Sequence, residues 1–181
     1  MKIWLALFKS INVGGNNKVP MKELVGMFER LGFQHVSYYI QSGNVIFRSA
    51  GHAKSMTKTI ADGMQATFGF TTPVLLINET VMQQALTANP FPELQSETEA
   101  KLLHVYFLDR PIDSIDQDRL AKVIRPGERW HCHESLFYLH TPDGAGNSKL
   151  ASQVEKITGR IATARNWRTV RTLAQMMKEL T

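Results

Sequence analysis

The sequence predicts an α+β protein made of two ferredoxin-like (βαββαβ-type) modules with antiparallel sheets, followed by a C-terminal helix. Short apolar runs alternate with segments whose apolar residues recur at helical spacing. Each half of the chain also contains a hairpin signal, and the order of elements in the first half recurs in the second. The chain has 181 residues, 43% apolar and 20% charged, which argues against disorder, collagen and coiled coil.

Turn and cap residues separate the elements of the first half. Pro20 favours the first position of a helix, Gly32 favours its end, and residues 41–44 are typical of a hairpin turn. The expected strands cover 2–9, 36–40, 45–48 and 73–77, and the expected helices cover 20–32, 53–68 and 79–87.

The second half repeats this order without recognisable sequence identity to the first. The expected strands cover 102–108, 129–132, 136–140 and 161–163, the expected helices cover 115–123 and 149–157, and an amphipathic helix follows at the C-terminus. Because two prolines and a polar run interrupt residues 89–99, the predicted division is an N-terminal module over 1–88, a linker over 89–99 and a second module over 100–181.

Composition narrows the setting of the protein. No apolar stretch approaches the ~18 residues of a transmembrane helix, so no membrane partner is expected. Cys132 is the only cysteine, which rules out an intrachain disulfide and fits a cytoplasmic protein. The net charge of +5 is compatible with a nucleic acid or phosphate ligand but is mild.

Two polar loops of the first module are expected to meet. The first two strands of a βαββαβ module run parallel, so the loop after the first strand and the turn after the second lie at one end of the sheet. Glycines there let backbone N–H groups approach an anion, and the helix starting at Pro20 favours one. The alternative is ordinary turn chemistry. The candidate ligand-binding residues are Asn12, Gly14, Gly15, Asn16, Lys18, Gln41, Ser42 and Asn44.

A basic run near the C-terminus provides a second candidate. Residues 156–178 contain six basic residues and no acid. Asn166 is expected to cap the last helix, and arginines near a helix start can hold phosphate bidentately. The alternative is a solvated face with helical salt bridges. The candidate residues here are Ser148, Lys149, Arg165, Asn166 and Arg168.

The second hairpin predicts a face rich in histidine. If residues 134–135 form the turn, His131, His133 and Tyr138 share one face with His140, and His104 and Tyr106 are expected to join them. His131, His133 and His104 are then weak candidates for a metal site, and stacking on RNA is a second interpretation. The remaining alternative is that the other module or the last helix covers this face. Cys132 is expected to be a core thiol.

Motifs along the whole chain resemble a bacterial family, domain-of-unknown-function family 1697. They are INVGG (11–15), VPM (19–21), YIQSGNV (39–45), SKL (148–150) and ATARNWRTV (162–170). The family usually has Arg-Gly before the first motif, where this chain has Lys9 and Ser10, so Lys9 keeps only the charge. The resemblance implies a small cytoplasmic α+β protein and no established activity, cofactor or catalytic residue.

Three functions follow as hypotheses. The favoured one is non-catalytic binding of nucleic acid or a phosphate-bearing ligand, without a cofactor. The first alternative is an enzyme that holds a small polar substrate in the pocket of Asn12 and Gln41, although no catalytic triad or paired carboxylates occur there. The second alternative is a protein-interaction module that uses Met176 and Met177 of the last helix.

Overall fold

A computed structural model describes residues 1–15 and 17–180 of the chain. The chain divides into two compact units: unit 1 comprises residues 1–83 and 173–181, and unit 2 comprises residues 84–172. Segment 89–99, expected to be a linker, falls inside unit 2, where Phe91 and Leu94 are buried. Two helices, α3 (Glu79–Thr87) and α6 (Trp167–Glu179), contribute residues to both units.

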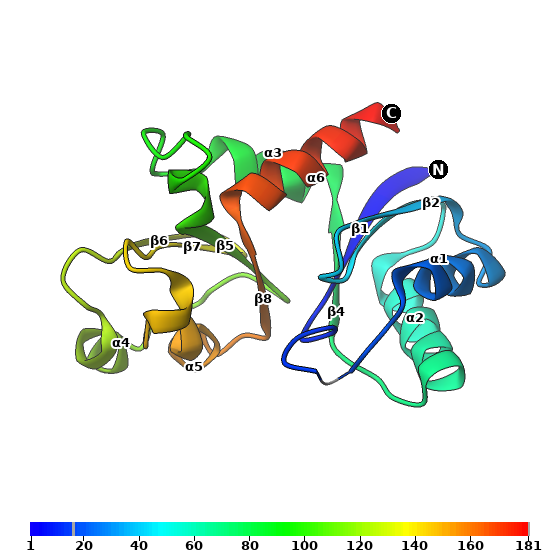
Figure 1. Ribbon diagram of the computed structural model, residues 1–181, viewed down its shortest axis with the longest axis horizontal. Coiled ribbons are helices and arrows are strands. Elements are labelled where there is room, and N and C mark those ends of the chain that lie inside the picture. Colours follow the sequence, from blue (N-terminus) through cyan, green and yellow to red (C-terminus); the bar gives the residue numbers. More distant parts are fainter. Residues whose placement is uncertain (16, 181) are drawn as a thin grey trace. The chain divides into compact units, whose positions relative to one another are not determined.

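Unit 1 has the expected βαββαβ order and a four-stranded antiparallel sheet with strand order β2-β3-β1-β4. Figure 1 shows α1 and α2 together on one side of this sheet. The elements are β1 (Lys2–Phe8), α1 (Met21–Arg30), β2 (Gln34–Tyr39), β3 (Asn44–Ser49), α2 (Ala53–Phe68) and β4 (Val74–Asn78).

The core of unit 1 follows from strand alternation. Trp4, Phe8 and Phe47 point toward the two helices, where Phe28 of α1 packs edge-on against Phe8 and Phe47. The opposite face of β1 is also buried, since Leu5 and Leu7 are fully inaccessible. A strand buried on both faces reads as a continuous apolar run, which is why residues 2–8 show no alternation.

Unit 2 repeats the topology of unit 1. Its antiparallel strand order is β6-β7-β5-β8, which matches unit 1 strand for strand. The elements are the 3₁₀ turn η1 (Glu99–Lys101), β5 (Leu103–Leu108), α4 (Gln117–Val123), β6 (Arg129–His133), β7 (Leu136–His140), the 3₁₀ turns η2 (Ala145–Asn147) and η3 (Ala151–Gln153), α5 (Val154–Thr158) and β8 (Ala162–Asn166).

Two boundaries in unit 2 differ from expectation. The predicted helix over 149–157 is a 3₁₀ turn followed by the short α5, and the Ser148 hydroxyl accepts from the Ala151 N–H where this segment begins. The predicted strand over 161–163 is longer and shifted, because β8 pairs with β5 up to Asn166. Arg165 therefore lies in a strand rather than in a loop before the last helix.

The predicted histidine face is wrong for β5. The register places His104 opposite Leu139 and Tyr106 opposite Phe137, so both belong to the face covered by α4 and α5. His131, by contrast, lies opposite Tyr138 on the other face. Because β5 is buried on both faces, its residues do not alternate between apolar and polar. The sequence therefore does not indicate which face of β5 lies on the same side of the sheet as His131.

The second face of this sheet is covered from within unit 2. Tyr138 is fully buried, and its hydroxyl donates to the Ala85 carbonyl oxygen of α3 at 2.9 Å. Phe91 packs near the ring of His140, and the Arg129 guanidinium lies 4.7 Å from the Phe91 ring centroid. The face is therefore not an open stacking platform, although His131 and His133 on the edge strand β6 stay exposed.

Candidate functional site

The two polar loops of unit 1 meet as predicted. The Phe8 N–H donates to the Gly43 carbonyl oxygen at 2.9 Å, and the Asn12 side-chain amide donates to the Gln41 carbonyl oxygen at 2.9 Å. These bonds join the segment after β1 to the turn between β2 and β3. We call residues 10–15, 17–20 and 40–44 the two-loop site; Asn16, also a candidate, lies outside the described residues.

Asn12 holds the first loop in shape. Its Nδ2 also donates to the Val19 carbonyl oxygen at 2.9 Å, and its Oδ1 accepts from the Val19 N–H at 2.7 Å. Asn12 itself has φ +56°, a left-handed conformation that asparagine tolerates better than most residues. Its amide therefore supports the backbone at the base of the site.

Gly43 and Asn44 fix the second loop. Asn44 is fully buried, and its Nδ2 donates to the Tyr39 carbonyl oxygen at 3.0 Å and to Ser42 Oγ at 2.9 Å. Gly43 has φ +72°, and a Cβ there would lie 2.7 Å from Ile11 Cδ1 and 2.8 Å from Phe8 Cβ. Only glycine fits this position.

This scaffold presents a set of exposed groups. Ile40 is 47% exposed and has φ +49°, which is rare for a β-branched residue and costs about 1–2 kcal/mol. Strain at an exposed position persists only where neighbouring bonds enforce it, and such positions cluster at binding sites. The other exposed residues of the site are Ser10, Val13, Gly14, Gly15, Asn17, Lys18, Pro20 and Gln41.

Positive charge is concentrated in unit 1. Unit 1 contains nine basic and five acidic residues, whereas unit 2 contains 12 and 11, so the net charges are +4 and +1. Residues 9–22, which include the first loop, contain three lysines and no acid, and residues 30–61 contain no acid either. The two-loop site therefore lies in the electropositive part of the chain.

The predicted arginines of unit 2 are engaged within that unit. Arg168 and Arg171 both pair with Glu97, at 3.5 and 3.4 Å. Arg165 is 8% exposed and donates to Thr163 Oγ1 at 3.0 Å and to the Ala164 carbonyl oxygen at 2.7 Å. Burial lowers the pKa of Arg165 to about 10. Glu97 lies far from Arg168 and Arg171 in the sequence, so the basic run by itself does not indicate that Glu97 is their ion-pair partner.

The other predicted residues of unit 2 have visible structural roles. Asn166 Oδ1 accepts from the Thr169 N–H at 2.9 Å, which confirms it as a cap of α6. Ser148 is buried and caps the turn at Ala151, while Lys149 is exposed. Burial raises the pKa of the Cys132 thiol, consistent with a core residue rather than a nucleophile.

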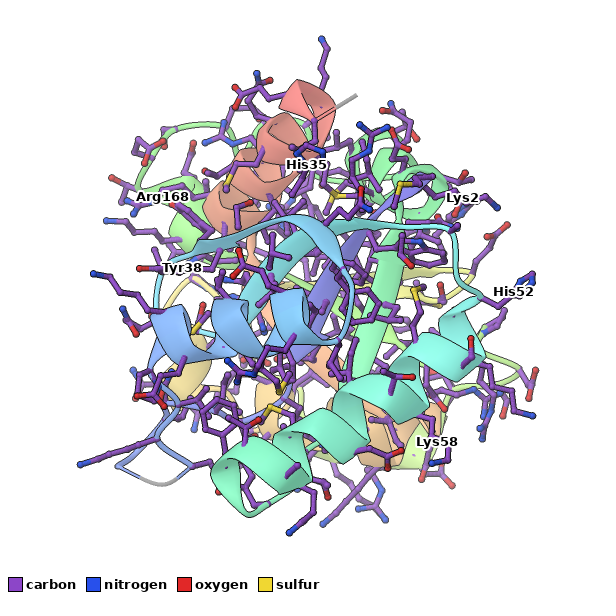
Figure 2. All side chains as sticks on the ribbon, turned by 90° about the vertical axis from the view of Figure 1, so that its right-hand side faces the viewer. Lys2, His35, Tyr38, His52, Lys58 and Arg168 are labelled. Atoms are coloured by element: carbon purple, nitrogen blue, oxygen red, sulfur yellow. The ribbon has the colours of Figure 1, made fainter. Side chains whose placement is uncertain are left out.

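Sequence reasoning missed a groove beside the two-loop site. It lies between α1 and β2 and encloses about 330 Å³, with lining residues Lys22, Val25, Val36, Ser37 and Tyr38. The signal for it is faint, because the lining comes from two elements whose facing could not be predicted. Figure 2 shows Tyr38 beside α1, well apart from Lys58 of α2.

The residues that the structure describes include neither a metal-binding cluster nor a membrane-spanning helix. Among those residues, no group of three or more His, Cys, Asp or Glu side chains is arranged to hold a metal ion. Among the same residues, no helix has the length and apolar character needed to cross a membrane.

Comparison with known proteins identifies the family. A search of curated proteins gives no match to this chain. The fold is similar to that of a solved structure described as conserved bacterial protein SP0830 from Streptococcus pneumoniae, with 22% sequence identity and a TM-score of 0.70 over 98% of this chain and 99% of that chain. Residues 1–138 match the family model described as a protein of unknown function, DUF1697, and the chain belongs to that family.

Proposed function

We propose that the chain binds a phosphate-bearing ligand at the two-loop site of unit 1 without catalysing a reaction. The observation that carries this proposal is the distribution of charge: the unit that brings the two loops together has a net charge of +4, and both acid-free segments adjoin the site. A dianionic phosphate is attracted to such a surface, and nearby acids would repel it.

The loops supply suitable donors for phosphate oxygens. Gly14 and Gly15 are exposed, and no heavy atom lies within 4 Å of the position a Cβ would take at either residue. A ligand can therefore come close to their backbone N–H groups. Lys18 in the loop and Lys22 in the first turn of α1 are both exposed and add two positive charges.

Binding explains the side-chain roles better than catalysis does. An enzyme at this site would use Asn12 and Asn44 to position its substrate. Here the side-chain amides of both residues form hydrogen bonds with backbone atoms of the two loops instead. The exposed remainder consists of backbone amides, one lysine, one glutamine, one asparagine, one serine, one proline and two aliphatic side chains. None of these groups is a carboxylate or an imidazole, the side chains that most often act as general bases.

The proposal is tested by binding measurements with two sources of phosphate. Ribose 5-phosphate is titrated by calorimetry, and labelled single-stranded RNA by fluorescence anisotropy, at about 50 and about 200 mM salt. We expect salt-sensitive binding that weakens in Lys18→Ala and Lys22→Ala, with the salt slope for RNA reduced by about one per lysine.

Lys54→Ala is the matched control. Lys54 is exposed and is the second residue of α2, just as Lys22 is the second residue of α1. Both variants therefore lose one charge at the same helical position. Binding of ribose 5-phosphate alone would assign a small-molecule ligand, and binding of RNA alone a polymer. If neither phosphate source binds, or if Lys54→Ala weakens binding as much as Lys22→Ala, the proposed function is wrong.

A further inference from the structure

The groove between α1 and β2 lies next to the two-loop site. α1 begins at Met21, one residue before Lys22, and β2 ends at Tyr39, one residue after Tyr38. The Asn12 amide nitrogen lies 3.9 Å from the sulfur of Met21, so the first loop contacts the start of α1. Lys22 and Tyr38 therefore mark the end of the groove that adjoins the loops.

The walls of the groove are mainly apolar. Val36 and Tyr38 lie two residues apart on the same face of β2, and both are half-buried against the core of unit 1. Val25 of α1 is half-buried on the other wall, and Ser37 borders the groove between Val36 and Tyr38. β2 is an edge strand, so no further strand of the sheet closes this side. The groove thus leaves aliphatic surface and a tyrosine beside a lysine, with no acid among its lining residues.

These features fit a ligand with a flat ring at one end and a phosphate at the other. A volume of about 330 Å³ is at the small end of ligand pockets, which suits a single base and sugar. Rings stack favourably on tyrosine regardless of base identity. Charge complementarity with Lys22 and Lys18 places the anionic end toward the loops.

We propose that this groove binds the base of a nucleoside monophosphate whose phosphate occupies the two-loop site. The inference rests on the proposed function and adds the class of ligand. The stacking on Tyr38 is sequence-tolerant, so purine and pyrimidine nucleotides are both accepted.

The experiment compares ligands that share a phosphate. The full chain is titrated with adenosine 5′-monophosphate, uridine 5′-monophosphate and ribose 5-phosphate. We expect both nucleotides to bind about tenfold more tightly than ribose 5-phosphate, since stacking of one base on an aromatic ring has about this effect. Tyr38→Leu should abolish this advantage and leave the affinity for ribose 5-phosphate unchanged.

Tyr39→Leu provides the matched control. Tyr39 is the next residue of the same strand and points to the opposite face, and it is half-buried like Tyr38. The advantage of the nucleotides should persist in this variant. A second test, Val25→Met, fills the groove from the α1 wall without adding charge and should also reduce nucleotide binding to the level of ribose 5-phosphate; thermal unfolding verifies that each variant is folded.

The outcomes separate the two proposals. If ribose 5-phosphate and the nucleotides bind with equal affinity to the unmodified chain, the groove takes no base and this inference is overturned, while the proposed function stands. The same holds if Tyr38→Leu and Tyr39→Leu have equal effects. If only RNA binds, this inference is overturned and the proposed function stands; if neither RNA nor any of the three small phosphates binds, the proposed function fails.

Discussion

Units 1 and 2 share one topology but differ in how many of their basic side chains form ion pairs. In unit 2, the arginines of exposed loops and helices mostly pair with carboxylates of the same unit, as Arg129 does with Glu93 and Arg119 with Asp116. In unit 1, Lys58 pairs with Asp62, but Lys18, Lys22 and Lys54 have no carboxylate of the described residues within ion-pair distance. The same fold therefore carries nearly balanced charge in unit 2 and excess positive charge in unit 1.

The loops at the ends of the two sheets differ as well. The turn between β2 and β3 is held by buried Asn44 and by Gly43, and it carries the strained Ile40. The corresponding turn between β6 and β7 is short, with Glu134 at φ +51°. The contacts of Asn44 and Gly43 hold the unit 1 turn in one strained conformation, which indicates that the shape of this turn has a role beyond connecting two strands.

Gly43→Ala should cause the largest loss of stability among the variants that test this difference between the units. The new Cβ would clash with Ile11 and Phe8 in a left-handed conformation, so we expect the free energy of unfolding to fall by about 3 kcal/mol. Gly144→Ala in unit 2, where φ is +86° but nothing lies within 4 Å, should lose only about 1 kcal/mol. Urea titration followed by circular dichroism measures both, and equal losses would contradict the role of the tight turn.

Asn12→Ala should have the next largest effect. It removes one hydrogen bond between the two loops and two within the first loop, and we expect a loss of about 2 kcal/mol in the free energy of unfolding. Asn166→Ala removes a single helix cap in unit 2 and should cost about 1 kcal/mol. Hydrogen exchange at Val19 should accelerate in Asn12→Ala only; unchanged exchange there would show that the loop holds without this residue.

Protonation of His104 should lower the free energy of unfolding at acid pH. Burial lowers the pKa of His104 below its ordinary 6.5, so the folded state disfavours the proton that the unfolded chain accepts. The sign follows from linkage: stability is highest above pH 6.5 and falls as the pH drops through 6.5 toward the lower folded value.

His104→Leu should flatten this part of the stability–pH profile, measured by urea unfolding between about pH 5 and pH 8. The matched control is His52→Gln in unit 1, where the side chain is exposed and the profile should keep its slope. His140 of unit 2, whose pKa is lowered by burial and by Arg129, leaves a residual slope in the His104 variant. A profile unchanged by His104→Leu would contradict the assignment.

The smallest expected effect concerns the basic run of unit 2. Arg168→Ala combined with Arg171→Ala removes two charges that Glu97 already offsets. We expect the affinity for labelled RNA to change by less than about twofold and the salt slope to stay the same. A loss as large as that of Lys18→Ala with Lys22→Ala would place the phosphate site in unit 2 and end the contrast between the units.

Much of the fold could be predicted because its signals are local. Proline and glycine positions indicated the limits of α1, and the turn at residues 41–44 predicted the β2–β3 hairpin. The parallel course of β1 and β2 then sufficed to predict the contact between Asn12 and Gln41. The cap at Asn166 could also be predicted, since capping depends on neighbours three residues away.

The errors concern interactions between residues far apart in sequence. The two faces of β5 are equally apolar, so nothing local indicates that His104 joins Leu139 rather than His131. Arg168 meets Glu97 across 71 residues, and the basic run alone therefore suggested free charges. The groove needs α1 and β2 to face each other, which depends on how the helix rotates on the sheet.

Unit 1 is discontinuous in sequence, because residues 173–181 complete it. Leu173 and Met177 of this last segment are buried, so they form part of a packed interior rather than a tail. On the ribosome, residues 1–83 emerge first but cannot reach their final packing until the whole of unit 2 has been made. Synthesis of the C-terminal turns of α6 must therefore precede the final packing of unit 1, and a chain that stops short of residue 173 leaves that unit incomplete although its first 83 residues were made first.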